Sequence, residues 1–304
     1  MSGQIGQRLK NIYGGTLCIN EPMSRHTTFR IGGAARYLVM PRTRDELAQT
    51  IQVCRQEQVP FYIIGNGSNL LVSDAGYEGV IIQIYQTLNS IEIDGDLAVI
   101  TAGAGALLVK IAKMACAAEL TGLEFASGIP GTVGGAVVMN AGAYGGEMKD
   151  VVSEVTVMDQ DGRFYTLQAD QLDFGYRHSA IAAENLIVVE VRLQLRVGVH
   201  QEIESCMKTL AAARKEKQPL EYPSAGSTFK RPEGYFAGKL IDDAGLRGYQ
   251  VGGARVSDKH CGFVVNTGGA TAADVMTLVE DVRRKVQENS GVTLEPEVKF
   301  LGSF

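Results

Sequence analysis

The sequence predicts an α+β protein of 304 residues that is long enough for two domains, or for one domain with a sizeable appendage. Apolar residues make up 45% of the chain, which is enough for hydrophobic cores. Strands and helices are predicted in a mixed order, without the regular β-α-β alternation of a doubly wound parallel sheet. Near His200 the character of the chain changes, and the shorter unit beyond it is typical of a separate small α/β domain.

The first elements lie between residues 37 and 102. They are a strand "RYLVM", a helix "TRDELAQTIQVCRQ", a strand that enters a glycine loop "PFYIIGNGSNLLV", a strand "GVIIQI" and a hairpin "SIEIDGDLAVITA". Thr43 and Glu46 have the spacing of a capping box at the start of the helix. Alternating apolar residues on both sides of Asp94-Gly95 predict the hairpin.

The remaining elements continue the mixed order. A helix "LLVKIAKMACAAEL" precedes a second hairpin, "SEVTVMDQDGRFYTL", with its turn at Asp161-Gly162, and a strand "LIVVEVRLQL" follows. Beyond a helix at about 201–217 come "YFAGKLIDDAG", the segments "VGGARVS" and "CGFVVN", a long amphipathic helix "AADVMTLVEDVRRKVQENSG" and a terminal strand "EPEVKFL". We therefore expect an N-terminal segment at 1–24, a first domain at 25–199 and a second at 200–304.

Two glycine-rich segments are candidates for ligand binding. "GNGSNLLVS" could turn backbone N–H groups onto an anion, but a plain tight loop is as good an interpretation. It lacks the Gly-Lys-Ser/Thr of a P-loop and the third glycine of a dinucleotide fingerprint. "GIPGTVGG" would let a flat or bulky ligand approach the backbone, with Gly134-Gly135 opening a helix toward a pyrophosphate. Tight packing of a helix on a strand is the alternative.

Composition argues against several classes of protein. The net charge of -5 disfavours a phosphate-backbone binder, so nucleic acid is not expected as a partner. The five cysteines have no CxxC spacing, which disfavours a disulfide framework and a metal site. The first 25 residues are polar and mixed and lack the apolar region of a signal peptide, and no apolar run approaches the roughly 20 residues needed to span a bilayer. We expect a cytoplasmic protein without membrane insertion.

Seven motifs resemble one enzyme family. They are "HTTFRIGGAARYLVMP", "GNGSNLLVSDAGYEGVII", "GLEFASGIPGTVGGAVVMNAGAYGGEMKDVV", "FGYRHS", "SAGSTFKRP", "AGKLIDDAGLRGYQVGGARVSDKHCGFVVN" and "LEPEVKFLG". In this order, from about Arg25 to Gly302, they resemble the UDP-N-acetylenolpyruvoylglucosamine reductase (MurB) family of bacterial peptidoglycan synthesis. The resemblance implies a vanillyl-alcohol-oxidase-type (PCMH) FAD-binding domain at 25–199 and a smaller α/β substrate-binding domain at 200–304.

The resemblance also implies an activity and its small-molecule partners. The activity is the NADPH-dependent reduction of UDP-N-acetylglucosamine enolpyruvate to UDP-N-acetylmuramate. The cofactor is non-covalently bound FAD, and NADPH is the co-substrate. The oligomeric state stays open. The family's cofactor-binding positions match two groups of residues here. The first loop supplies Gly65, Asn66, Gly67, Ser68 and Asn69, and the second supplies Ser127, Gly128, Ile129, Pro130, Gly131, Gly135 and Asn140.

Three residues match the family's catalytic positions. Arg177 in "GYRHS" could face a carboxylate or its enolate with a bidentate fork, although a surface arginine is the plainer interpretation from sequence alone. Ser227 in "AGSTFKRP" aligns with the proton donor, although a lone loop serine is usually a turn or cap residue. Glu297, on one face of the predicted terminal strand with Glu295, matches a second acidic participant, although an exposed edge is the plainer interpretation.

The resemblance implies substrate contacts at Lys217, near the diphosphate, at Arg231 and at His260. Lys217, with the basic residues before it, could instead complement a helix dipole. Arg231 stands where other members carry Asn, His260 where some carry Gln, and Lys299 where an Arg is common. The segment after "GYRHS" is too short for the tyrosine-bearing loop of one branch, so the chain resembles the shorter branch.

Two other classes of function stay open at this point. An oxidase of the same fold would use oxygen, often with a flavin linked to His or Cys, and His26 and His178 are available. A non-catalytic nucleotide-binding protein would keep the fold without turnover. The presence of Arg177, Ser227 and Glu297 together favours the reductase.

Overall fold

The computed structural model describes residues 2–304, which divide into two compact units. The first unit comprises Met1–Cys18, Tyr37–Asn66 and Gly79–Arg214, and the second comprises Ile19–Arg36, Gly67–Glu78 and Lys215–Phe304. Each unit therefore draws on three separate stretches of the chain. The division at residues 24/25 and 199/200, into segments with separate functions, stays a prediction.

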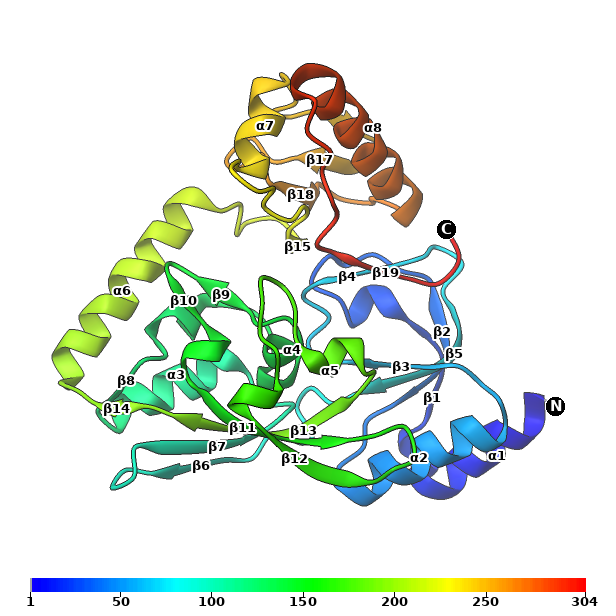
Figure 1. Ribbon diagram of the computed structural model, residues 1–304. Coiled ribbons are helices and arrows are strands. Elements are labelled where there is room, and N and C mark those ends of the chain that lie inside the picture. The colour runs from blue at the N-terminus through cyan, green and yellow to red at the C-terminus, as the bar shows by residue number, and fades with distance from the viewer. Residues whose placement is uncertain (1) are drawn as a thin grey trace. The chain divides into compact units, whose positions relative to one another are not determined.

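The first unit contains a five-stranded antiparallel sheet in the order β12-β11-β13-β7-β6 (Figure 1). Its strands are β6 (Ile91–Asp94), β7 (Val99–Gly103), β11 (Val152–Met158), β12 (Phe164–Gln168) and β13 (Ile187–Gln194). Strands β6 and β7 pair from Asp94 opposite Val99, and β11 pairs with β12. Both predicted hairpins are therefore confirmed.

Six α-helices begin in the first unit. They are α1 (Ser2–Tyr13), α2 (Arg44–Gln56), α3 (Leu108–Ala117), α4 (Val133–Val138), α5 (Ala180–Ala183) and α6 (His200–Lys217). Helix α1 was not predicted, because we assigned no element to residues 1–24. Its Ile5, Leu9 and Tyr13 recur at helical spacing and are buried, so packing against the core stabilises this helix.

The predicted start of α2 is confirmed, but only half of its capping box forms. The Thr43 hydroxyl accepts the Glu46 N–H at 3.1 Å, as an N-cap residue does. The Glu46 carboxylate instead accepts the backbone N–H of Arg42 at 2.7 Å. One of the two expected reciprocal hydrogen bonds has therefore moved one residue upstream.

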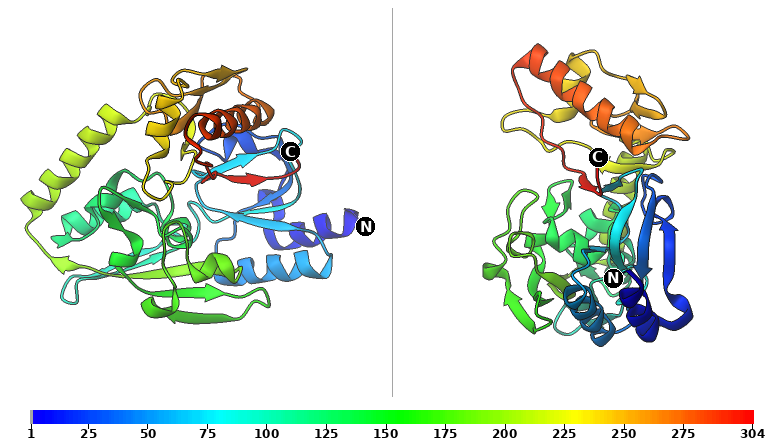
Figure 2. Two further views of the ribbon diagram at one scale, coloured as in Figure 1. Left: turned by 45° about the horizontal axis from the view of Figure 1, so that its top comes forward. Right: turned by 90° about the vertical axis from the view of Figure 1, so that its right-hand side faces the viewer.

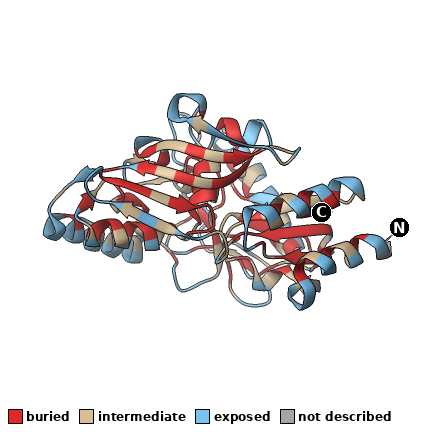
Figure 3. Ribbon diagram, turned by 90° about the horizontal axis from the view of Figure 1, so that it is seen from below, coloured by how far each residue is buried: buried red, intermediate tan, exposed pale blue. Residues whose placement is uncertain are grey.

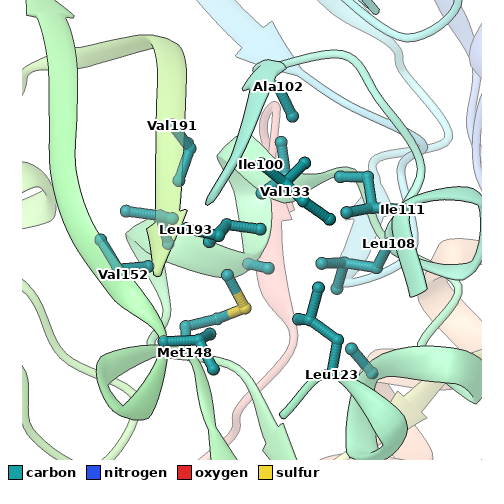
Figure 4. Close-up of a cluster of buried hydrophobic side chains, with 14 of the residues drawn as sticks. Ile100, Ala102, Leu108, Ile111, Leu123, Val133, Met148, Val152, Val191 and Leu193 are labelled. Carbon is teal, nitrogen blue, oxygen red and sulfur yellow. The ribbon is translucent and has the colours of Figure 1, made fainter. Parts of the chain in front are cut away.

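A hydrophobic core joins this sheet to helices α3 and α4. Figure 4 shows Ile100, Leu108, Val133 and Leu193 converging with the Met148 side chain, and all five are buried. The three central strands carry mostly buried residues (Figure 3). In α6, by contrast, only Ile203 is buried. The sheet and its two helices therefore share a closely packed core, next to which the loops beside α4 lie.

Further short strands and turns complete these stretches of chain. A four-stranded sheet has the order β1-β2-β5-β3, with β1 (Cys18–Pro22), β2 (Ala34–Val39), β3 (Phe61–Ile64) and β5 (Tyr77–Gln83). Two-stranded pairs are β8 (Leu120–Thr121) with β14 (Arg196–Val197), and β9 (Gly142–Ala143) with β10 (Gly146–Glu147). Short 3₁₀ turns are η1 (Gly14–Thr16), η2 (Met23–Arg25), η3 (Glu124–Gly128), η4 (Met148–Asp150) and η5 (Ala169–Gln171).

The second unit contains a four-stranded antiparallel sheet in the order β15-β18-β17-β16. Its strands are β15 (Ser224–Ser227), β16 (Gln250–Val251), β17 (Ala254–Val256) and β18 (Phe263–Asn266). Figure 2 shows helices α7 (Ala237–Asp243) and α8 (Ala272–Ser290) beside these strands. The helices and strands share one hydrophobic core. The Asp74 carboxylate accepts the backbone N–H groups of Ala272 and Ala273 at 2.8 and 2.9 Å, which caps the start of α8.

The terminal strand is shorter than predicted. Strand β19 (Lys299–Leu301) pairs in parallel with β4 (Leu70–Val72). Glu295 and Glu297 precede it, so the prediction that they lie on the strand is wrong. They flank Pro296, which forms an isolated bridge with Phe229.

Across residues 2–304, every helix is too short or too polar to cross a lipid bilayer.

Candidate functional site: two glycine loops and a serine–glutamate pair

The start of the first glycine loop, at Gly65 and Asn66, is joined to the second glycine loop inside the first unit. The Asn66 amide donates to the Pro130 carbonyl at 2.5 Å. A side chain at Gly65 would overlap the Thr132 hydroxyl, so glycine at this position allows the loops to touch. The structure therefore brings together the two segments that we expected to share one extended ligand.

The N-terminus of α4 does not present its N–H groups to a ligand. Val133 donates to the Ala106 carbonyl at 2.8 Å, and Gly134 donates to the Ala104 carbonyl at 2.9 Å. A Cβ at Gly134 would lie only 2.8 Å from the Ala104 Cβ. The suggestion that Gly134-Gly135 opens a helix toward a pyrophosphate is therefore wrong at Gly134, where close packing explains the glycine.

Gly135 differs from its neighbour. A Cβ built there would meet nothing closer than the Thr132 hydroxyl at 3.6 Å, an ordinary contact, so packing within the protein does not require glycine. Its N–H points at that hydroxyl, 3.4 Å away, because Thr132 is the N-cap of α4. We did not single out Thr132, although a Thr immediately before a short helix is a recognisable cap.

The second loop is also fixed by its own side chains and by α6. The Ser127 hydroxyl donates to the Glu124 carbonyl at 2.7 Å, inside η3. The Arg214 guanidinium donates to the Gly128 carbonyl and lies over the Tyr144 ring, 5.7 Å from its centroid. Sequence reasoning grouped Arg214 with basic residues that complement a helix dipole, and the structure gives it this loop contact instead.

Arg177 lies in a tight turn between Gly175 and His178, which form an isolated antiparallel bridge. Its backbone has a φ of 53°, which is uncommon for a residue with a side chain. The guanidinium lies 5.0 Å from the centroid of the Tyr176 ring, and the His178 ring contacts the Asp173 carboxylate at 3.2 Å. This turn is therefore held in a conformation that its own sequence does not favour.

In the second unit, Ser227 and Glu297 lie on adjoining backbone segments. Ser227 ends β15 opposite Phe263, and Thr228 beside it accepts the Glu297 N–H at 2.8 Å. The Asn69 amide donates to the Glu297 carbonyl at 3.1 Å. Three predicted motifs therefore meet at Glu297 of "LEPEVKFLG". The first glycine loop contributes Asn69, and "AGSTFKRP" contributes Thr228.

The three predicted substrate-binding residues have different surroundings. Lys217 is exposed at the end of α6, where the Lys259 ammonium donates to the Lys215 carbonyl at 2.7 Å. Arg231 is exposed and lies over the Phe236 ring, 3.9 Å from its centroid. His260 packs edge-on against Phe263, with ring centroids 5.0 Å apart.

The hydrogen bonding of His260 fixes its tautomer. Its Nδ1 accepts the Gly262 N–H at 3.0 Å, so the neutral ring carries its proton on Nε2. Burial lowers the pKa of His260 below its ordinary value. The ring is therefore a neutral donor at neutral pH.

We expect stability to fall as the pH drops from about 6.5 toward the lowered pKa of folded His260, because the unfolded chain then binds a proton that the folded chain does not. His260→Gln should remove this part of the pH dependence, measured by urea unfolding at about pH 7.5 and about pH 5.5. Thr50→Ala, which removes a buried hydrogen-bonding side chain that does not titrate, is the control and should lower stability by the same amount at both pH values. The prediction is contradicted if His260→Gln loses as much stability between the two pH values as the wild type does.

Comparisons with known proteins place the chain in one family. A model of an FAD binding domain matches residues 35–168, and a model of the C-terminal domain of UDP-N-acetylenolpyruvoylglucosamine reductase matches residues 218–301. A reductase of this name from Agathobacter rectalis is 56% identical over 295 residues, with 94% of each chain covered. One from Lachnoclostridium phytofermentans is 51% identical and covers 99% of this chain and 98% of its own.

Solved structures give the same result for the fold. The crystal structure of UDP-N-acetylenolpyruvylglucosamine reductase from Thermus caldophilus has a TM-score of 0.80 and 40% identity, and the match covers 94% of this chain and 98% of that chain. A grass pollen allergen with glucose dehydrogenase activity matches 64% of this chain and 44% of its own, with a TM-score of 0.51 and 14% identity, a likeness of fold alone. The predicted fold class and the resemblance are confirmed.

Proposed function

Since this chain belongs to the UDP-N-acetylenolpyruvoylglucosamine reductase family, we propose that it reduces UDP-N-acetylglucosamine enolpyruvate to UDP-N-acetylmuramate in the cytoplasm, as a step of peptidoglycan precursor synthesis. It is an FAD-dependent oxidoreductase that acts on a small molecule. NADPH is the reductant and uses the substrate's site in turn. The observation that carries the proposal is the 56% identity over almost the whole chain, together with the adjoining segments of Ser227 and Glu297.

The glycine loops fit FAD. Asn66 ties one loop to the other, and the space beside Gly135 is not filled by the protein, so a ligand can lie against that backbone. The residues that hold FAD are Gly65, Asn66, Gly67, Ser68, Asn69, Ser127, Gly128, Ile129, Pro130, Gly131 and Gly135.

The reaction adds a hydride to one carbon of the enolpyruvyl double bond and a proton to the other. Bound FAD supplies the hydride. The Ser227 hydroxyl gives the proton, and Glu297, whose backbone bonds to the residue after Ser227, acts as the second acidic group. Arg177 stabilises the negative charge that develops beside the substrate carboxylate, because its planar fork can donate two hydrogen bonds to one carboxylate.

Three basic or donor side chains bind the substrate. Lys217 contacts the diphosphate as a point charge. Arg231 offers a second cation, which lies over the Phe236 ring. His260 offers the Nε2 proton of its neutral ring as a donor.

The test is made on the purified protein under anaerobic conditions. The protein should be yellow and release FAD, NADPH should bleach the flavin absorbance, and the UDP-enolpyruvyl sugar should restore it. UDP-N-acetylglucosamine, which lacks the enolpyruvyl ether, is the control and should leave the flavin reduced. Rapid reoxidation by air without the enolpyruvyl sugar would favour an oxidase, and a protein that takes up no FAD would overturn the proposal.

A further inference from the structure

Asn140 is a fully buried polar residue of the first unit whose side chain is occupied by three protein groups. Its Nδ2 donates to the Glu147 carboxylate at 2.5 Å and to the Gly175 carbonyl at 3.0 Å. Its Oδ1 accepts the Lys149 N–H at 2.9 Å. Both amide hydrogens are thus used within the protein, although the family resemblance assigns Asn140 to the cofactor.

The chemistry of these partners fixes the orientation of the amide. Glu147 and Gly175 present only acceptor oxygens to the side chain, and Lys149 presents a donor N–H. The flipped amide would place its oxygen against two other oxygens. Asp would have no donor for either acceptor and would add a negative charge beside Glu147, so among residues of this size only Asn satisfies all three groups.

One of these partners begins the turn that carries Arg177. Gly175 and His178 exchange backbone hydrogen bonds of 3.1 and 3.3 Å around Tyr176 and Arg177. The left-handed backbone of Arg177 costs of order 1 kcal/mol, and such a conformation persists only where surrounding contacts impose it. The hydrogen bond from Asn140 to the Gly175 carbonyl is a buried contact of this kind.

The other partners tie the same amide to a second segment. Glu147 ends β10, and its carboxylate also pairs with the Lys149 ammonium at 2.5 Å. The β9–β10 hairpin and the Arg177 turn therefore meet at one buried side chain. Loss of the Asn140 amide would leave hydrogen-bonding groups of both segments without their partner.

We infer that Asn140 is a positioning residue, which fixes the Arg177 turn through the Gly175 carbonyl and does not itself bind FAD. The inference rests on the proposed role of Arg177 in stabilising the substrate's developing charge. Displacement of a reacting group by about 1 Å can cost about 100-fold in rate, so a residue that only holds this turn can have a large kinetic effect.

The experiment compares Asn140→Ala, Arg177→Ala and the double variant as holoenzymes. The measured quantities are FAD affinity, thermal stability, and the rate at which the enolpyruvyl substrate reoxidises the reduced flavin. Asn140→Ala should keep FAD affinity within about 3-fold and slow reoxidation by about 10- to 100-fold. In the Arg177→Ala background the same change should slow reoxidation by less than about 3-fold, because the effects of coupled residues are not additive.

Thr50→Ala is the matched control for loss of a buried hydrogen-bonding side chain, since the Thr50 hydroxyl contacts Tyr13 and Glu46 in the same unit. It should lower stability without changing the reoxidation rate. If Asn140→Ala does not fold, Asn140→Asp replaces it, because Asp keeps the size and the acceptor for Lys149 and removes both donors.

Each other outcome has one meaning. Loss of FAD with a normal rate per bound flavin would make Asn140 a cofactor residue and overturn the inference. Additive effects in the double variant would show that Asn140 acts independently of Arg177, and an equal kinetic loss in Thr50→Ala would show general destabilisation. A normal reoxidation rate in Arg177→Ala would instead refute the proposed role of Arg177, and the inference with it.

Discussion

Replacing Ser227 with alanine is expected to slow reduction of the enolpyruvyl substrate by about 10²- to 10⁴-fold, the usual contribution of a positioned general acid. Ser227 follows Gly226, whose φ of 78° turns the backbone, and precedes Thr228, which is held by Gly262 and Glu297. The backbone that carries the Ser227 hydroxyl is therefore held in place, and alanine removes only the proton donor. Stopped-flow measurement of flavin reoxidation by the substrate gives this rate.

The reduction of the flavin by NADPH should be unchanged in Ser227→Ala, because that step requires no proton from this hydroxyl. Ser224→Ala is the matched control, since Ser224 lies in the same strand and uses its backbone carbonyl to accept the Thr28 hydroxyl at 2.7 Å. It should leave both rates at the wild-type value. Reoxidation of Ser227→Ala at the wild-type rate would refute its role as proton donor.

Replacing Gly67 with alanine should weaken FAD binding by at least about 10-fold. The left-handed backbone of Gly67, with a φ of 62°, costs an alanine about 1–2 kcal/mol. The added Cβ would also overlap the His26 carbonyl and lie 2.9 Å from the Thr27 Cα. These are backbone atoms, so the loop itself must move, and a change of 1.4 kcal/mol is already tenfold in affinity.

The control variant Gly162→Ala separates the effect of backbone strain from the effect of steric overlap. Gly162 has a similar φ of 83°, but nothing lies within 4 Å of its built Cβ. This control should lower the free energy of unfolding by about 1–2 kcal/mol and leave FAD affinity unchanged. Titration of the apoprotein with FAD, followed by flavin fluorescence, measures the affinities. Equal FAD affinity in Gly67→Ala and the wild type would contradict a role of this loop in cofactor binding.

Local patterns in the sequence predicted most of the elements correctly. The cap at Thr43, the turns at Asp94-Gly95 and Asp161-Gly162, and the long α8 helix are all set by residues that are neighbours in the chain. Helix α1 was not predicted, although Ile5, Leu9 and Tyr13 recur at helical spacing and are buried in the structure, because the polar residues between them obscured this pattern. The strand at Lys299 was predicted too long, because its ladder with β4 lies far away in sequence.

The candidate site divides in the same way. Sequence motifs by themselves determined the family, the fold class and which loops are rich in glycine. Only the tertiary structure decided why each glycine is there: Gly134 packs on Ala104, whereas Gly135 has room beside it. It also decided that the N–H groups at the start of α4 bind the carbonyls of residues 104 and 106.

Asn140 is the clearest example of a residue whose contacts the sequence did not predict. The sequence shows an asparagine in a glycine-rich loop, and by resemblance this predicts a cofactor contact. The structure surrounds its amide with Glu147, Lys149 and Gly175. Secondary structure follows from neighbours in the chain, and so the sequence determined it. Which buried polar group satisfies which other depends on distant segments, and only the folded chain brings those together.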